Sequence, residues 1–270
     1  MTSSNPGKIL LFFAHPDDET SSSGGTISKY SKLGSQVYVC TATNGNKGDL
    51  GTGDLKLTRE ELGRYRENEE IEVLKSLGAY DVFQLGYDDQ GLELLKDGVL
   101  EQQFLDILQN IQPSIVITFG KRGFSGHTDH IQVNINATTA FSKYVSLNSD
   151  LDIKLFYTAM PKLVAEKREM DLSEEEKSPT VGIDISDTWM NKVNGLKMYK
   201  SQKDAQEIAG MFETMYNGNF FDNFGESKDE MIQIFESLKN YGYTSNPTEY
   251  FHQYHPKLEN YAHVILANRF

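Results

Sequence analysis

The sequence predicts an α/β protein with a Rossmann-like, mostly parallel sheet flanked by helices. Apolar runs of strand length alternate with longer segments of helical periodicity, which is the pattern of βαβ units. The runs are apolar at successive positions, as expected of strands that are buried on both faces. The chain of 270 residues, 38% of them hydrophobic, is long enough to bury such a sheet.

Six segments have the length and composition of strands. The first four are apolar runs separated by helical segments, and the last two are more loosely spaced. The six segments are 9–14 (ILLFFA), 36–43 (QVYVCTAT), 81–85 (DVFQL), 114–119 (SIVITF), 153–159 (IKLFYTA) and 180–185 (TVGIDI).

Helices are predicted between these strands. The clearest runs from Thr58 to Leu77, because Thr58 and Glu61 form a capping-box pattern and Gly78 supplies a stop signal. Another runs from Gly98 to Ile111 and ends before Pro113. Helices in these positions would cover the faces of the sheet.

We interpret residues 1–270 as one domain, with a core at about 8–200 and a helical, aromatic-rich C-terminal extension at about 201–270. The charged stretch 165–179 is expected to be a solvated loop or a short exposed helix. The Phe and Tyr residues of 211–261 predict a satellite core or, alternatively, a segment that covers a substrate.

Composition excludes several classes of function. The net charge of −13 repels phosphate backbones, so nucleic acid is not an expected partner. Cys40 is the only cysteine, which excludes an intrachain disulfide and a thiolate-rich zinc site. No apolar run approaches the roughly 20 residues of a membrane span, and the start lacks the apolar core of a signal peptide. We therefore expect a cytoplasmic protein without an integral membrane segment.

Polar side chains follow two strands that the expected strand order 3-2-1-4-5 makes neighbours. His15 to Glu19 follow the first strand, and the segment GFSGHTDH (123–130) follows the fourth. Ligands of open parallel sheets bind outside the carboxyl ends of the strands, where the strand order reverses. Both segments should therefore line one crevice, with Glu19 capping the next helix or hydrogen-bonding around the site without binding a metal.

These residue types suit a catalytic zinc site, which needs about three nitrogen or oxygen ligands and an open position. His15 and Asp18 can supply two ligands from one turn, and either His127 or His130 can complete the set. The remaining histidine is then free to stabilise the transition state. Asp17 is placed to take a proton from an activated water. Iron would suit the same ligands.

The motif AHPDDE after an apolar strand, with GHTDH about 110 residues later, resembles the zinc-dependent deacetylases of the PIG-L/LmbE type, which act on N-acetylglucosamine compounds. The resemblance covers Lys8 to Val133. Intermediate segments agree with it, namely TNGNKGD (43–49), RENEEIEVLKSLG (66–78) and LGYDDQG (85–91).

The resemblance implies zinc ligands, a general base, an oxyanion-stabilising pair and groups that hold sugar hydroxyls. In that order, these are His15, Asp18 and His130; Asp17; His127 paired with Asp129; and Arg66 with Asp89.

Two positions depart from the family pattern. Ser125 stands where some relatives carry a tyrosine that contributes to the tetrahedral intermediate. Tyr199, in YKSQ, stands where the family often has the histidine of His-x-Ser-Gln. The distal half of the pocket therefore need not bind the same substrate as in such relatives.

The motifs favour a zinc-dependent N-deacetylase that hydrolyses the amide of a small N-acetylglucosamine-type substrate, and they leave a monomer and a homo-oligomer open. One alternative is a metal-dependent phosphoester hydrolase, for which Lys121 and Arg122 would bind the phosphate. The other is a non-catalytic carbohydrate-binding protein, which would have no use for Asp17 beside a pair of ligands.

Overall fold

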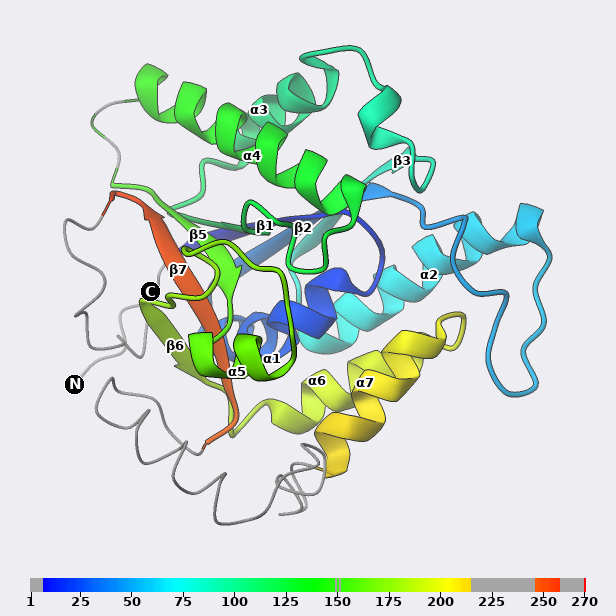
Figure 1. The fold of residues 1–270 in the computed structure, drawn as a ribbon. Coiled ribbons are helices and arrows are strands. Elements are labelled where there is room, and N and C mark those ends of the chain that lie inside the picture. Colours follow the sequence, from blue (N-terminus) through cyan, green and yellow to red (C-terminus); the bar gives the residue numbers. More distant parts are fainter. Residues whose placement is uncertain (1–6, 149, 151, 215–245, 258–269) are drawn as a thin grey trace.

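The computed structural model describes residues 7–148, 150, 152–214, 246–257 and 270. The described strands form one seven-stranded sheet with helices packed on both faces (Figure 1). This architecture confirms the predicted α/β fold class. Within these residues, no helix combines the length and the apolar composition that crossing a bilayer requires.

The strand order is β3-β2-β1-β4-β5-β7-β6. The first five strands pair in parallel, which confirms the predicted order 3-2-1-4-5. The six segments predicted from the sequence are all strands, with ends that differ by at most two residues. The strands are β1 (Lys8–Phe13), β2 (Gln36–Thr43), β3 (Asp81–Tyr87), β4 (Ile115–Thr118), β5 (Lys154–Ala159), β6 (Val181–Asp184) and β7 (Thr248–His255).

Both predicted helices are present. In the second helix along the chain, the backbone N–H of Thr58 donates to Oε2 of Glu61 at 2.9 Å, and Gly78 ends the helix with a φ of 88°. The helices are α1 (Asp18–Lys32), α2 (Arg59–Leu77), α3 (Val99–Ile111), α4 (Thr128–Leu147), α5 (Lys162–Lys167), α6 (Trp189–Met198) and α7 (Lys203–Thr214), with a 3₁₀ turn η1 at Leu92–Leu94.

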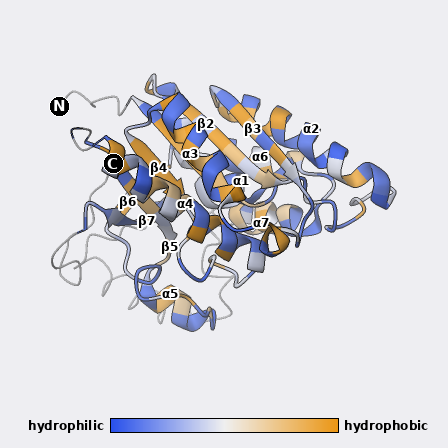
Figure 2. Cartoon of the chain, turned by 90° about the horizontal axis from the view of Figure 1, so that it is seen from above, coloured by the Kyte–Doolittle hydropathy of each residue, from blue (hydrophilic) through white to orange (hydrophobic). Residues whose placement is uncertain are grey.

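The helices form two layers around the sheet. Figure 1 shows α3 and α4 on one face and α1, α2, α6 and α7 on the other. Strands β2 and β4 are predominantly hydrophobic, whereas β7 and the helices carry hydrophilic residues as well (Figure 2). Ile9 to Phe13 of β1 are each at most 1% exposed, so the central strand lies in the middle of the core.

Helix α1 depends on tertiary contacts, because its segment SSSGG (21–25) is a poor helix former. The carboxylate of Glu249, from β7, accepts the backbone N–H of Gly25 at 3.0 Å and of Thr26 at 2.7 Å. Lys192 of α6 lies 2.6 Å from the same carboxylate. β7 and α6 therefore stabilise α1, whose first two residues, Asp18 and Glu19, end the AHPDDE motif.

Strand β7 was not predicted by any apolar run. Its sequence TEYFHQYH mixes polar and aromatic residues, yet it lies between β5 and β6 as an inner, antiparallel strand. It belongs to the stretch assigned to the C-terminal extension, and the boundary between core and extension stays a prediction. The aromatic segment NGNFFDNFGES (217–227) lies outside the described residues.

The charged stretch 165–179 corresponds in part to the expectation of an exposed segment. It contains the end of the short helix α5, but Glu176 is fully buried. Its carboxylate accepts the backbone N–H groups of Arg122 at 3.1 Å and Phe124 at 3.0 Å. The prediction was wrong for Glu176, because its carboxylate accepts hydrogen bonds from backbone N–H groups of the loop that precedes α4.

Candidate active site

The two polar segments meet at the carboxyl ends of β1 and β4. These strands pair in parallel, with Phe12 opposite Thr118, so the turns that follow them leave the same edge of the sheet. His15 lies in the turn after β1, and His127 is the N-cap of α4. The predicted convergence of the two segments is therefore observed.

Three predicted ligand atoms form a nearly equilateral triangle. Nδ1 of His15 lies 3.1 Å from Nε2 of His130, and Oδ2 of Asp18 lies 3.3 Å from each of these nitrogens. Tetrahedral zinc with bonds of about 2.05 Å requires about 3.3 Å between ligand atoms. The three side chains thus fit a zinc ion without rearrangement.

Asp18 supplies the negative charge of this set. Burial would raise the pKa of its carboxyl group, but His130 and His15 beside it hold that pKa well below its usual range. The group is therefore an anion, as a metal ligand must be. Its Oδ2 atom also accepts the backbone N–H of His15 at 2.8 Å, which fixes the carboxylate toward the centre of the site.

In each of the two predicted histidine ligands, the second ring nitrogen also has a hydrogen-bond partner. Nε2 of His15 lies 3.2 Å from Oδ2 of Asp129, and Nδ1 of His130 lies 2.9 Å from the carbonyl oxygen of Gly123. Acceptors in these positions fix the tautomer in which the other ring nitrogen faces the metal. Ser125 lies 3.1 Å from the same nitrogen of His130, so it contacts a ligand at the position where some relatives carry tyrosine.

Wider sets of donors overlap this triangle. Ring nitrogens of His15, His127 and His130 lie within 4.8 Å of one another, and so do donor atoms of His15, Asp89, His127 and Asp129. The set of His15, Asp18 and His130 has shorter distances between its donor atoms, 3.1–3.3 Å, and does not include His127. Geometry therefore favours His130 as the third ligand and leaves His127 for another role.

Asp17 has a strained backbone. Its φ of 103° lies in the left-handed region, which costs a non-glycine residue about 1–3 kcal/mol. Its Oδ2 atom lies 2.9 Å from Nη2 of Arg66, whereas the neighbouring Asp18 faces the histidines. The two adjacent carboxylates thus point to different partners.

The environment of Asp17 suits a proton acceptor. Burial raises the pKa of its carboxyl group to about 8, although the charge of Arg66 opposes this rise. A cation bound by Asp18 would lower that pKa further toward neutrality. The side chain of Asp17 keeps 22% of its surface exposed, so solvent can reach it.

His127 presents a nitrogen to the site. Its Nδ1 atom accepts the backbone N–H of Asp129 at 3.2 Å, which leaves the proton of the neutral ring on Nε2. Burial, together with the charges of His15 and His130, lowers the pKa of His127. Its Nε2 atom lies 3.9 Å from Oδ1 of Asp89. His127 is thus arranged as a neutral hydrogen-bond donor.

The pairing expected between the side chains of His127 and Asp129 is not the arrangement observed. The carboxylate of Asp129 bonds instead to His15 and to the backbone N–H groups of Gln90 at 2.6 Å and Leu92 at 3.2 Å. The reason is that Asp129 lies in the first turn of α4 and faces the segment after β3. Its carboxylate therefore connects His15, a predicted metal ligand, to the segment after β3.

Arg66 does not point into solvent. Its side chain is only 4% exposed, and it donates to the carbonyl oxygens of Pro16 at 2.5 Å and Gly45 at 2.9 Å as well as to Asp17. A Cβ atom on Gly45 would lie 2.3 Å from Nη1 of Arg66, so the glycine makes room for the guanidinium. The structure places Arg66 against the proposed base and away from the predicted contact with a sugar.

Asp89, the other predicted sugar contact, does face the site. Its Oδ1 atom lies 3.2 Å from Nε2 of His15, but that nitrogen hydrogen-bonds to Asp129, so Oδ1 of Asp89 has no hydrogen bond of its own within the part of the chain that the structure describes. This oxygen is buried and available to accept from a ligand.

Tyr199 and Glu19 form a part of the site that the sequence pattern did not assign. Both are fully buried, and the hydroxyl of Tyr199 donates to Oε1 of Glu19 at 2.6 Å. Tyr199, which stands in place of the family histidine, therefore has its side chain packed in the interior against Glu19. The expectation that Glu19 makes hydrogen bonds is confirmed, since it accepts the backbone N–H of Asp17 at 3.0 Å.

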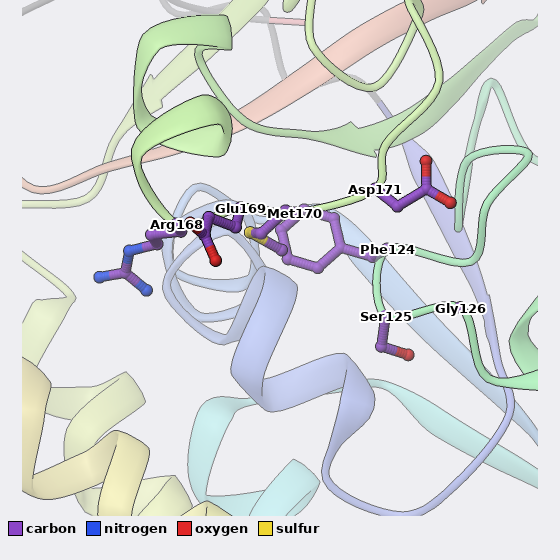
Figure 3. Close-up of a pocket in the computed structure, with 7 residues that line it drawn as sticks. All are labelled: Phe124, Ser125, Gly126, Arg168, Glu169, Met170 and Asp171. Atoms are coloured by element: carbon purple, nitrogen blue, oxygen red, sulfur yellow. The ribbon is translucent and has the colours of Figure 1, made fainter.

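A hollow lies beside the loop that carries His127. Figure 3 shows Phe124 to Gly126 on one side of it and residues 168–171 on the other. Its volume is about 270 Å³. The ring of Phe124 faces Met170, and Ser125 lies at the edge nearer the N-terminus of α1 (Figure 3). The hollow offers an apolar surface next to polar groups.

The fold and these side chains define an α/β protein with a candidate His/Asp metal centre at the carboxyl ends of β1 and β4. Residues 10–141 match the family model described as PIG-L: GlcNAc-PI de-N-acetylase. This match identifies residues 10–141 as a PIG-L family domain and confirms the resemblance seen in its motifs.

One curated relative is the 1D-myo-inositol 2-acetamido-2-deoxy-alpha-D-glucopyranoside deacetylase of Salinispora arenicola. It is 28% identical over 197 residues, which cover 66% of this chain and 64% of the relative. The chain therefore spans less than two thirds of the length of that protein.

Two solved structures share the fold. N,N'-diacetylchitobiose deacetylase from Pyrococcus horikoshii has a TM-score of 0.62 and 22% identity, over 93% of this chain and 86% of that one. The 4-carboxy-2-hydroxymuconate hydratase of Pseudomonas putida KT2440 has a TM-score of 0.65 and 16% identity, over 94% and 98%. Because the second enzyme is named a hydratase, the fold alone does not identify the reaction.

Proposed function

We propose that the protein is a zinc-dependent N-deacetylase that hydrolyses the acetamide of an N-acetylglucosamine-type sugar. The observation that carries the proposal is the triangle of His15, Asp18 and His130, with edges of 3.1–3.3 Å, directly beside the strained Asp17. Ligands and a separate base in adjacent positions are what hydrolysis by an activated water requires.

His15, Asp18 and His130 would hold a zinc ion, which would supply the positive charge that lowers the pKa of a water molecule from about 15.7 to about 7. Asp17 takes the proton of the water as it attacks the acetamide carbonyl carbon. Nε2–H of His127 donates to the carbonyl oxygen as negative charge develops there. Asp17 then gives the proton to the departing nitrogen, so that the products are acetate and the free amine.

The neutral state of His127 is inferred from its hydrogen bond to the backbone of Asp129. A protonated ring would place a proton on Nδ1, where the backbone N–H of Asp129 already donates. The neutral ring instead keeps that hydrogen bond and still presents one donor to the oxyanion. Asp129 supports this donor through its backbone, and its carboxylate orients His15.

The substrate class follows from the family and from the surroundings of the site. The curated relative and the chitobiose enzyme are named as deacetylases of acetamido sugars. In this chain, Oδ1 of Asp89 is a free acceptor suited to a sugar hydroxyl, and the hollow beside Phe124 has room for the group attached to the sugar. We infer a small-molecule substrate and, from the single buried Cys40, a reducing cytoplasmic location.

The two basic residues that a phosphoester hydrolase would use to bind phosphate are paired with carboxylates. Nζ of Lys121 lies 2.5 Å from Glu175, and Arg122 is paired with Asp171. Both cations are therefore engaged with carboxylates of the 165–179 stretch and are not directed at a phosphate. A carbohydrate-binding protein without catalytic activity would not need the strained backbone conformation of Asp17.

The test is an assay of acetate release by zinc-loaded protein from GlcNAc, GlcNAc-malate, GlcNAc-inositol and N-acetylated chito-oligomers. We expect turnover of at least one of these compounds and its loss in Asp17→Asn. Metal analysis of the purified protein distinguishes zinc from iron, which the same ligands would accept. Release of phosphate from phosphoesters without any release of acetate would favour the alternative enzyme class.

A further inference from the structure

The α6–α7 junction lies directly behind the proposed base. Tyr199 follows the last residue of α6 and is fully buried, with its hydroxyl 2.6 Å from Oε1 of Glu19. The next residues are anchored too, because Ser201 bonds to Glu69 of α2 and Gln202 bonds to the backbone of Asp49. The segment YKSQ therefore joins three separate parts of the fold.

Glu19 connects this junction to Asp17. Its two carboxylate oxygens have different partners: Oε1 accepts from Tyr199 and Thr20, and Oε2 accepts the backbone N–H of Asp17 at 3.0 Å. Glu19 is itself fully buried. Because both oxygens are occupied, the orientation of the carboxylate toward Asp17 depends on the donors at its other end.

The backbone of Asp17 needs such a restraint. A residue with a φ of 103° relaxes to a common conformation unless its surroundings prevent this. Arg66 restrains the side chain at 2.9 Å, and the carbonyl oxygen of Asp17 accepts from the N–H of Ser21 at 2.9 Å. Glu19 supplies the restraint on the N–H, and so it fixes the remaining polar group of this peptide.

We propose that Tyr199 is a positioning residue for Asp17: its hydroxyl fixes the Glu19 carboxylate, which holds the Asp17 N–H and keeps the base in its left-handed conformation. The inference rests on the proposed function, in which Asp17 is the base. Tyr199 acts through Glu19 and does not touch the substrate, since its side chain is buried behind the site.

The kinetic test removes the hydroxyl with Tyr199→Phe. We expect kcat to fall about tenfold, because a hydrogen bond to a charged group is lost, while KM and zinc content stay at wild-type values. Tyr144→Phe is the matched control, since Tyr144 is a buried tyrosine whose hydroxyl has no hydrogen-bond partner among the described residues. That control should keep wild-type kcat. An increase in KM with unchanged kcat in Tyr199→Phe would mean that Tyr199 contacts the substrate, and it would overturn the proposal.

A double-mutant cycle tests the route through Glu19. In a Glu19→Ala background, adding Tyr199→Phe should change kcat by less than about twofold, because the intermediate group is already gone. If Glu19→Ala and Tyr199→Phe instead lower kcat by independent factors, Tyr199 acts by another path and the inference is refuted.

Crystal structures of zinc-loaded wild type and Tyr199→Phe provide a readout that does not need activity. We expect Asp17 to leave the left-handed region, or its contact with Arg66 to lengthen, in the variant only. An unchanged Asp17 in Tyr199→Phe would refute the inference. If wild type releases no acetate from any amide but Asp17 moves in the variant, the proposed reaction fails and the positioning role stands.

Discussion

Nη2 of Arg66 lies 2.9 Å from Oδ2 of Asp17, and the same nitrogen donates to the carbonyl oxygen of Pro16. One guanidinium thus holds both the side chain of the proposed base and the peptide before it. A lysine has the charge but not the planar fork that makes several such bonds at once. If Asp17 is the base, as we propose, the contact between Arg66 and Asp17 should affect the rate of the chemical step.

Arg66→Lys should lower kcat by about 10- to 100-fold with little change in KM, because the base is displaced while substrate binding is retained. Measuring kcat and KM separately checks this. Arg59→Lys is a suitable control, since Arg59 also donates to two backbone carbonyl oxygens but lies away from Asp17. A large rise in KM alone for Arg66→Lys would restore the role of a sugar contact.

Alanine variants of the three histidines should lose activity for different reasons. His130→Ala and His15→Ala should lose the metal, because each removes one corner of the ligand triangle. His127→Ala should keep about one metal ion per chain while kcat falls about 10²- to 10³-fold, the usual result of losing one oxyanion donor. Elemental analysis of the three purified variants decides this. An empty site in His127→Ala with a full one in His130→Ala would exchange the roles.

Individual residues show which parts of the candidate site could be predicted from the sequence. His15, Asp18 and His130 could be predicted to converge, because they follow strands whose parallel order is readable from apolar runs. The direction of the Arg66 side chain could not, since it depends on the space left by Gly45. A motif places a residue near a site, but its partners come from segments distant in sequence.

The fold shows the same division. Strands β1, β2, β4 and β5 are predictable because burial on both faces makes their sequences largely apolar, whereas the edge strand β3 is only partly buried. β7 was missed, since TEYFHQYH carries polar side chains at several positions. One of these, Glu249, is polar for a structural reason: it accepts from backbone N–H groups inside α1 and pairs with Lys192.

Glu249→Gln should destabilise the protein strongly, by about 3–5 kcal/mol, because it leaves Lys192 buried without a charged partner. Both side chains are at most 4% exposed. Urea denaturation of zinc-loaded protein measures the change in the free energy of unfolding. The exposed pair of Lys203 and Glu207 provides the control, and Glu207→Gln should have an effect within the error of the measurement. Equal stability of the two variants would argue against a structural role for Glu249.

Glu70 should make stability depend on pH. Burial, reinforced by the charge of Glu19, raises the pKa of its carboxyl group to about 8, from 4.5 in the absence of such effects. Between these values the folded protein keeps a proton that the unfolded chain has lost. The stability contributed by the neutral group is therefore fully present below the unfolded pKa and is lost as the pH rises to about 8.

The variant Glu70→Gln tests this, because an amide resembles the protonated acid and can still bond to Thr41 and Gln84. At pH 8 its Tm should exceed that of wild type by about 2–4 °C for each kcal/mol regained, and the difference should vanish near pH 5. Thermal unfolding of both proteins across this range is the measurement. A constant difference in Tm at all pH values would contradict the assignment of a raised pKa.

The adjacent residues Asp17 and Asp18 point to different partners, and their amide variants should therefore differ in kind. Asp18→Asn replaces a charged ligand 3.3 Å from both histidine nitrogens by a neutral one, so it should weaken metal binding. Excess zinc should partly restore its activity. Asp17→Asn keeps the contact atoms facing Arg66 but cannot take a proton, so metal content should stay near wild type.

For Asp17→Asn we expect kcat to fall about 10²- to 10⁴-fold, the range that a general base contributes, and zinc should not restore it. The acid limb of the pH profile of kcat/KM, which reports ionisation in the free enzyme, should also disappear. Metal analysis, zinc titration of activity and the pH profile separate the two variants. Loss of metal from Asp17→Asn, or a wild-type kcat with an unchanged acid limb, would mean that the strained residue after β1 is not the base.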